Sequence, residues 1–379
     1  MRETVFLQNI ISPYRANFFN ALQQEYDNFA VYYMGESEPD KFWDVSKVTM
    51  NYPHWVDYHG WYITPSKSFG THCNPILFFK LIMSRKVKNI VFAVSWTDLN
   101  IMAIAIAKHL HLTSKRIFFW AEANYSAEWT KKHNTKLKWW LKRMVFSSVD
   151  GAMIIPGKMA DMTFEKWNIP IKNKIYLPNT INSSQLVYDN RKKKEQHEFP
   201  EFIMPFRLIE RIKGGLNFFE AITPANICKA IFYVVGDGED RRLYLDYVKQ
   251  HNYEENIKVS EGFFNVRQMC ELYNRVDGFI LPSFSDASPL TLIEALNFHL
   301  PILCSNHCGN HYEAVEEGVN GFTFSPNDKD EIKSKFERLL SVRDKWNEMG
   351  EKSFEIYQNR FETEKIIKRF VSQYICFKK

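Results

Sequence analysis

Two acidic residues, Asp286 and Glu294, are separated by seven residues in the segment 283–296 (SFSDASPLTLIEAL). The second acid lies in a run that otherwise has the composition of a buried helix, with Leu290 and Phe298 one turn away on its own face. A carboxylate in apolar surroundings is costly unless a partner bonds it. Glu294 is therefore a candidate ligand-binding acid, and the alternative is a carboxylate on a solvated helix face.

The helix that carries Glu294 has a well-marked start in the sequence. Ser288 is a favourable N-cap residue, Pro289 suits the first helical position, which needs no N–H, and Leu290 continues the first turn. The free N–H groups and the macrodipole of such a start attract anions. One turn can thus hold a phosphate, with a carboxylate on each side to accept hydroxyl protons, and this pattern indicates a sugar-nucleotide site.

These residues resemble the signature of the retaining glycosyltransferases of family 4. The signature has two acids separated by seven residues, then Ala, then a Pro that opens the next strand, and here it reads Asp286, Glu294-Ala295 and Pro301. The resemblance covers nearly the whole second half of the chain. It implies that Asp286 contacts the transferred sugar and that Glu294 binds the ribose hydroxyls of the donor.

The chain departs from the family pattern at its first acid. Asp286 replaces the usual Glu and is shorter by one methylene, ~1.5 Å. We therefore expect a different sugar or a different distance to it. The alternative for Asp286 is an ordinary loop or capping residue.

A group of cations follows the strand expected at Phe202–Pro205. Two cations on one loop can neutralise a diphosphate, and each charge-assisted hydrogen bond contributes ~1.5–3 kcal/mol. The resemblance assigns this role to Arg207 and Lys213. The loop is longer than usual by one residue, so Arg211 is a substitute for either cation, and the alternative is a basic surface loop.

Two further loops complete the expected donor site. Gly236 and Gly238 lie between a strand and a helix, where glycine permits a tight turn with the backbone close to a ligand. Their position resembles the second-domain loop of the family. Phe263, in the segment 261–264 (EGFF), is expected in the nucleobase pocket, with a packing role as the alternative.

In the first half, ligands are expected at the carboxyl ends of the strands, in segments 12–15, 95–98 and 122–125. The Gly-rich loop that many relatives carry after the first strand is absent, and Pro-Tyr-Arg stands there instead. Glu122 occupies a position where relatives carry a polar active-site residue. It is a candidate for orienting the acceptor or the sugar, and the alternative is a salt-bridged loop acid.

The segment Lys131–Phe146 predicts a helix with one apolar and one basic side. The apolar stripe is Leu137, Trp140, Leu141, Met144 and Val145. The basic arc is Lys131, Lys132, Lys136, Lys138, Lys142 and Arg143. Trp139 lies within this arc, which suits an anionic membrane surface, where each Lys or Arg contributes ~1 kcal/mol. The alternative is a solvated helix whose stripe packs on its own domain.

Composition narrows the class of protein. A chain of 379 residues with 45% apolar residues is expected to form two globular domains. The net charge of +5 does not call for nucleic acid. No signal peptide or membrane span is expected, because the longest uncharged apolar run, near Ile101–Ala107, is short, and we expect a cytoplasmic protein. Six scattered Cys imply no disulfide framework, and the Cys and His between 304 and 311 match no common zinc spacing.

Short apolar strands alternate with amphipathic helices, which indicates parallel α/β sheets. Strands are expected at Thr4–Gln8, Ala30–Tyr33, Asn89–Val94, Arg116–Trp120, Ala152–Ile155, Phe202–Pro205, Ala230–Val235, Ile257–Ser260, Gly278–Leu281, Pro301–Cys304 and Phe322–Phe324. By resemblance, two Rossmann-like domains face a cleft in the GT-B arrangement, and the last helix crosses back to the first domain. The expected parts are residues 1–185, an acceptor domain; 186–200, a charged linker; 201–355, a nucleotide-sugar domain; and 356–379, the returning helix.

The resemblance implies a retaining, metal-independent glycosyltransferase without a cofactor. It would move a sugar from a UDP- or GDP-linked donor to a hydroxyl of a glycan, lipid-linked and made for a bacterial-type surface polysaccharide or glycoconjugate. The basic helix would hold the protein at the inner face of the cytoplasmic membrane. Two alternatives stay open: a GT-B epimerase of sugar nucleotides, and a catalytically silent sugar-nucleotide-binding scaffold.

Overall fold

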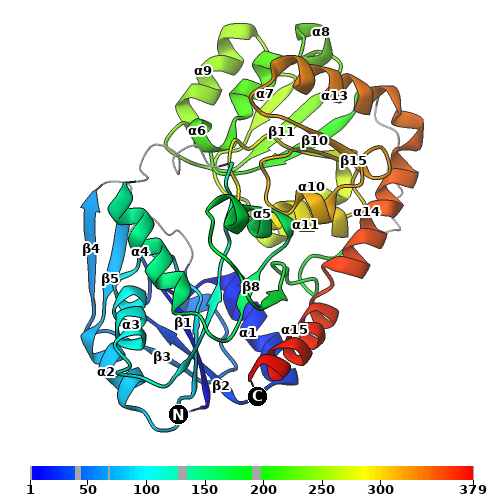
Figure 1. Cartoon of the computed structure of the whole chain (residues 1–379). Coiled ribbons are helices and arrows are strands. Elements are labelled where there is room, and N and C mark those ends of the chain that lie inside the picture. The colour runs from blue at the N-terminus through cyan, green and yellow to red at the C-terminus, as the bar shows by residue number, and fades with distance from the viewer. Residues whose placement is uncertain (1, 39–43, 67–68, 127–134, 190–197, 379) are drawn as a thin grey trace.

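The computed structural model of the chain describes residues 2–38, 44–66, 69–126, 135–189 and 198–378. It contains two lobes, each built on a parallel sheet between helices (Figure 1). The expected charged linker falls largely on residues 190–197, which lie outside the described residues.

The first sheet has seven strands in the order β3-β2-β1-β6-β7-β8-β9, and every neighbouring pair is parallel. Its strands are β1 (Thr4–Gln8), β2 (Phe29–Tyr33), β3 (His54–Val56), β6 (Asn89–Phe92), β7 (Arg116–Trp120), β8 (Met153–Ile155) and β9 (Lys174–Tyr176). The helices of this domain are α1 (Pro13–Glu25), α2 (Pro75–Met83), α3 (Leu99–His109), α4 (Lys136–Ser147) and α5 (Lys158–Lys166), with a short 3-10 turn η1 (Val45–Lys47). Helices cover both faces of a parallel sheet, so β1 and β2 are buried along their whole length.

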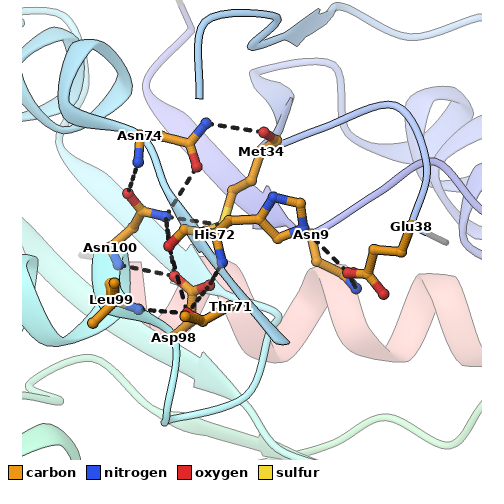
Figure 2. A network of polar contacts seen from close by, with 9 residues as sticks. All are labelled: Asn9, Met34, Glu38, Thr71, His72, Asn74, Asp98, Leu99 and Asn100. Atoms are coloured by element: carbon orange, nitrogen blue, oxygen red, sulfur yellow. Dashed lines mark hydrogen bonds and ion pairs between the residues drawn. The ribbon is translucent and has the colours of Figure 1, made fainter. Parts of the chain in front are cut away.

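An antiparallel hairpin, β4 (Trp61–Ser66) and β5 (Phe69–Cys73), stands beside the first sheet and was not expected from the sequence. A network of polar contacts joins it to α3 (Figure 2). Asp98 caps α3 through the N–H of Asn100 at 2.9 Å and also accepts from the N–H of His72 in β5. Burial raises the pKa of Asp98, and these hydrogen bonds oppose that rise.

The same network reaches the end of β1. The His72 ring contacts Glu38 Oε1 at 3.1 Å, and Asn9 Nδ2 donates to the same oxygen at 2.8 Å. Asn74 Nδ2 donates to the carbonyl of Met34 after β2. The carboxyl ends of β1 and β2 are therefore fixed to the hairpin by paired polar groups, which a buried network needs in order to be stable.

The second sheet has six parallel strands in the order β12-β11-β10-β13-β14-β15. Its strands are β10 (Glu201–Pro205), β11 (Ile231–Val235), β12 (Ile257–Val259), β13 (Gly278–Leu281), β14 (Ile302–Ser305) and β15 (Gly321–Phe324). Its helices are α6 (Glu210–Lys213), α7 (Gly215–Ala221), α8 (Pro224–Ile227), α9 (Arg241–His251), α10 (Val266–Arg275), α11 (Leu290–Asn297), α12 (His311–Ala314) and α13 (Lys329–Ser341), followed by η3 (Arg343–Lys345). The expected strands of both halves appear within a few residues of their predicted bounds.

The C-terminal tail forms two helices, α14 (Trp346–Arg360) and α15 (Thr363–Lys378). The second, red in Figure 1, lies against α1 in the first lobe. Ile366, Ile367 and Phe370 are buried in the core of the first domain, and the Tyr374 hydroxyl lies 2.8 Å from Thr4 Oγ1. The returning helix is thus confirmed, and with it the GT-B arrangement.

Because α15 completes the core of the first domain, we predict that Phe370→Ala lowers the free energy of unfolding by about 3–5 kcal/mol. Ile375→Ala on the same helix is the matched control, since Ile375 is exposed, and its loss should stay below about 1 kcal/mol. Urea unfolding of the full chain measures both values. Equal losses in the two variants would mean that α15 is not part of this core.

Candidate active site

A cavity of about 610 Å³ lies at the carboxyl ends of β1, β6 and β7. Helices α1, α4 and α5 supply further walls, and Ser285 and Ala287 reach it from the second domain. The cavity thus lies where ligands bind in open parallel sheets. Its volume falls within the range of small-molecule sites, roughly 300–1,000 Å³.

The two domains are joined at this cavity by the Asn124 side chain. Its Nδ2 donates to the carbonyls of Asp286 at 2.9 Å and His307 at 2.8 Å. Ser126 fixes the amide in turn, because its N–H donates to Asn124 Oδ1. These contacts hold the backbone of Asp286 at the edge of the cavity.

Asp286 forms an ion pair with Lys213, and both side chains are less than one-fifth exposed. Lys213 ends α6, and Gly214 follows it in the left-handed conformation at φ 63°, which glycine adopts without strain. The structure therefore joins the first acid of the predicted signature to one of its predicted cations. In this state each charge neutralises the other.

The other two cations of the loop differ in their surroundings. Arg207 follows β10 directly and is half-buried. Arg211 is exposed and pairs with Glu239 at 3.0 Å. An exposed pair of this kind contributes little stability, and the geometry favours Lys213 over Arg211 as the inner cation.

Glu210 anchors this loop, a role that the sequence analysis did not identify. Its carboxylate accepts from the N–H groups of Leu216 and Asn217 at the start of α7, and from the Tyr244 hydroxyl at 2.6 Å. The loop that carries the cations is therefore held by a carboxylate at a helix start, where the macrodipole favours negative charge.

Gly236 and Gly238 follow β11 and pack against the loop that carries the cations. A Cβ on Gly236 would lie 2.0 Å from the carbonyl oxygen of Phe206, and one on Gly238 would lie 2.4 Å from that of Leu208. Both glycines are therefore required by close approach to the backbone on either side of Arg207. Phe263, half exposed, lies in the loop between β12 and α10.

Glu294 accepts a hydrogen bond from the Tyr273 hydroxyl at 2.9 Å. The residue keeps partial exposure, but protein atoms surround its carboxylate, so burial raises its pKa and the bond from Tyr273 lowers it. Tyr273 is fully buried on α10 and stacks on Phe298 at 4.9 Å between ring centroids. No local pattern distinguishes Tyr273, because it reads as one more aromatic residue of an amphipathic helix.

The start of α11 differs from the expectation. Pro289 occupies the cap position with an extended ψ of 124°, the helix begins at Leu290, and no side chain caps it. The expected N-cap role of Ser288 is therefore wrong, because the extended proline separates its side chain from the first turn. Within the described residues, the Ser288 hydroxyl is buried and has no hydrogen-bond partner. A free hydroxyl beside free helical N–H groups can donate to an anion.

Glu122 forms an ion pair with Arg15 at 2.7 Å, and both residues line the cavity. The Arg15 guanidinium also lies 3.8 Å from the centroid of the Trp120 ring. The structure thus places Glu122 in the salt-bridged arrangement that the sequence left open as the alternative. Its carboxylate still lies at the cavity wall, where it can accept from a ligand hydroxyl.

Helix α4 is rotated relative to the predicted stripe. Lys142, expected on the basic surface, is only 5% exposed, whereas Leu137 and Trp140 of the expected buried stripe are 65% and 57% exposed. Apolar residues occur nearly all round this helix, so periodicity alone did not select the buried face. Val145 of the expected stripe is buried as predicted, and Lys142 and Phe146 pack inward beside it. Lys131 and Lys132 lie outside the described residues.

The Cys and His between 304 and 311 do not form a metal site. His311 Nδ1 contacts the carbonyl of Cys308 at 2.7 Å, and His307 Nδ1 contacts that of Phe284 at 2.9 Å. Burial raises the pKa of Cys308 and lowers that of His311. Across the described ranges, no three His, Cys, Asp or Glu are grouped so as to hold a metal ion.

Known proteins resemble this chain both in the sequence of its second domain and in its overall fold. Residues 188–355, which form most of the second domain, match the family model described as glycosyl transferases group 1. Anabaena HepE in complex with UDP and glucose superimposes with a TM-score of 0.72 at 14% identity, over 99% of this chain and 100% of that one. Sucrose-phosphate synthase from Thermosynechococcus elongatus gives a TM-score of 0.70 at 14% identity, over 99% of each chain. At such identities these structures establish the GT-B fold alone.

Curated relatives match over part of their length. N-acetyl-alpha-D-glucosaminyl L-malate synthase of Bacillus anthracis is 25% identical over 172 residues, 45% of this chain and 44% of that protein. The UDP-Gal:alpha-D-GlcNAc-diphosphoundecaprenol alpha-1,3-galactosyltransferase of Escherichia coli is 30% identical over 135 residues, 33% of each chain. Sucrose synthase 2 of Pisum sativum is 27% identical over 124 residues, 31% of this chain and 15% of that protein. The matches thus span less than half of each of these relatives.

Glu294→Gln removes a carboxylate that burial destabilises, so we predict an unchanged or raised melting temperature without ligand. Its folded-state pKa is raised above the unfolded value of about 4.3. The wild type therefore loses stability as pH rises from that value through the folded-state pKa, and the variant does not. The amount by which the variant is more stable than the wild type should grow as pH rises to the folded-state pKa and stay constant above it. Melting curves across this window measure it, and an advantage that shrinks with rising pH would contradict the assignment.

Proposed function

We propose that this protein is a retaining glycosyltransferase that moves a sugar from a UDP- or GDP-linked donor to a hydroxyl of a glycan acceptor. The observation that carries the proposal is the Lys213–Asp286 ion pair, held by Asn124 at the edge of a cavity lined by both domains. The family of the second domain supports the reaction class. The UDP and glucose in the HepE complex, and the UDP-Gal in the name of the Escherichia coli relative, support the donor class.

In the proposed donor complex, Glu294 accepts hydrogen bonds from the ribose hydroxyls. The diphosphate lies between the start of α11, Arg207 and Lys213. Its arrival draws Lys213 away from Asp286, and the released carboxylate then accepts from a hydroxyl of the sugar. Burial makes each of these charge-assisted bonds stronger than it would be in water.

The acceptor hydroxyl approaches the anomeric carbon from the cavity of the first domain. Its oxygen forms the new glycosidic bond on the face from which the diphosphate departs, so the anomeric configuration is retained. The bond from the anomeric carbon to the phosphate oxygen breaks, and that oxygen takes the acceptor proton. Arg207 and Lys213 stabilise the charge that develops on the leaving group, which is electrostatic catalysis by preorganised groups.

We further propose that the acceptor is lipid-linked, belongs to a bacterial-type surface glycan, and is reached from the inner face of the cytoplasmic membrane. None of the described helices is long and apolar enough to cross a membrane. The exposed side of α4 supports a peripheral contact, because Leu137, Trp139 and Trp140 are all exposed beside Lys136 and Arg143. Aromatic and basic side chains of this kind suit a lipid interface.

The donor is tested by thermal shift against UDP-, GDP- and ADP-sugars. We expect a UDP- or GDP-sugar to raise the melting temperature of the wild type, and Glu294→Gln and Lys213→Met each to reduce its affinity about tenfold or more. Lys249→Met on α9 is the matched control for loss of one lysine, since Lys249 is exposed and far along the chain from the loop. No shift with any nucleotide sugar would overturn the proposal.

Slow donor hydrolysis in the absence of acceptor then separates a transferase from a silent scaffold. Release of nucleoside diphosphate by the wild type, lost in Asp286→Asn, is the expected result. Conversion of the donor into an epimer without release of the nucleotide would establish the alternative epimerase.

Turnover should survive EDTA. Arg207, Lys213 and the start of α11 supply the positive potential that a divalent ion provides in other phosphate sites. Initial rates with and without chelator measure the effect. Complete loss of turnover, restored by manganese or magnesium, would contradict the proposed role of these groups.

For the membrane contact, we predict that the protein co-sediments with anionic vesicles and is released by salt. The double variant Lys136→Glu/Arg143→Glu removes two attractions worth ~1 kcal/mol each and should weaken binding at least about tenfold. The control Lys249→Glu/Arg338→Glu changes the net charge equally, but both residues are exposed in the second domain. Equal binding by the two double variants would show that α4 is not the contact.

A further inference from the structure

Lys142 is buried in the cavity wall without an ionic partner. Its ammonium lies 3.7 Å from the centroid of the Trp167 ring and 5.4 Å from that of Trp96, and the side chain lines the cavity. In the part of the chain that the structure describes, no carboxylate pairs with it, and burial alone lowers its pKa. The two rings offset part of the cost of removing this charge from water.

Among the described residues that line the cavity, positive charges likewise outnumber negative ones. Arg15 is neutralised by Glu122, whereas Lys138 and Lys142 face the cavity with no such partner in the described residues. Much of the remaining wall is aromatic, with Trp96, Trp120 and Trp167 among its residues. Flat apolar rings suit the C–H faces of sugar rings, and an uncompensated ammonium suits an anion.

We propose that the acceptor carries an anionic group, a carboxylate or a phosphate ester, which pairs with the Lys142 ammonium between Trp96 and Trp167. This inference rests on the proposed function, because it places the acceptor in the cavity opposite the donor loop. The anion supplies a counter-charge that Lys142 does not find among the described residues. The pair forms away from water, where a charge-assisted hydrogen bond is strong and discriminates against a neutral acceptor. Lys142 is therefore a specificity-determining residue.

The cavity geometry is consistent with this use of the site. Ser285 and Ala287, on either side of Asp286, line the same cavity as Lys142. An acceptor held at Lys142 thus lies in the space that adjoins the loop of the proposed sugar contact. Asn124 joins that loop to the first domain, which also carries Lys142.

The test uses matched pairs of small probes and the intrinsic fluorescence of Trp96 and Trp167. Methyl β-D-glucoside and methyl β-D-galactoside are compared with the corresponding glucuronide and galacturonide, and with their 6-phosphates. We expect the wild type to bind at least one anionic series about tenfold more tightly than the neutral one. The glucuronide and phosphate arms distinguish which anion is preferred.

Lys142→Met should reduce this preference to about twofold or less, since it retains the length of the side chain and removes the charge. Lys136→Met, on the same helix but exposed and outside the cavity wall, should retain the preference. Lys142→Gln provides a second neutral variant if the methionine does not fold, and Lys142→Arg should restore the preference. Melting temperatures report on folding.

Three results would overturn the inference: equal binding of neutral and anionic probes by the wild type, no binding of any anionic probe, or a preference that persists without the Lys142 charge. A lower melting temperature of Lys142→Met with an unchanged preference would assign the residue to packing alone. Donor binding, measured by thermal shift on the same samples, should be equal in wild type and Lys142→Met. If the wild type binds no donor, that result counts against the proposed function and not against the anion site.

Discussion

The amide of Asn124 is a hydrogen-bonded contact at the place where the two halves of the site meet. Each domain brings the carboxyl ends of its parallel strands to one edge, and a single side chain from the first domain donates to two carbonyls of the second. These carbonyls belong to Asp286 and His307, so the clamp acts on the backbone next to the ion-paired acid. Backbone acceptors do not depend on the neighbouring side chain, which leaves Asp286 available for chemistry while its position is fixed.

The charged groups of the site are arranged so that each is partly compensated in the absence of ligand. Lys213 neutralises Asp286, Arg15 neutralises Glu122, and the Tyr273 hydroxyl supports Glu294. Among the described residues, Lys138 and Lys142 line the cavity without an ion pair, and the buried Gln8 Nε2, Trp120 Nε1 and Ser288 hydroxyl have no hydrogen-bond partner. Polar groups that are buried without partners reduce stability, and their concentration around one cavity is typical of a site that a ligand completes.

The rest of the fold supplies rigidity to these contacts. Glu210 fixes the cation loop to α7, and Gly236 and Gly238 allow β11 to approach that loop closely. In the first domain, the network around Asp98 ties the hairpin to the strand ends (Figure 2). Helix α15 then fills the core of the first domain with residues that follow the second in sequence. The domains are therefore connected by the chain at two places and at the site by hydrogen bonds that include those of Asn124 and Asn179.

The sequence by itself determined the elements and the signature residues. Alternating apolar strands and amphipathic helices are local patterns, so β1, β7, β10 and β13 could be predicted within a few residues. The acids Asp286 and Glu294 and the cations Arg207 and Lys213 lie in short segments of the chain. Their spacing and order can be recognised in the sequence without knowledge of the fold. The returning helix followed from the family resemblance.

The tertiary structure decided which groups face one another. Tyr273, Glu210 and Asn124 act through contacts between residues that are distant in sequence, and no local pattern distinguishes them from packing residues. The orientation of α4 was also decided by packing. Apolar residues lie around most of the circumference of this helix, so several of its faces could pack inward. Burial of Lys142 against Trp96 and Trp167 was therefore not predictable, since these three residues come from separate elements that only the folded sheet brings together.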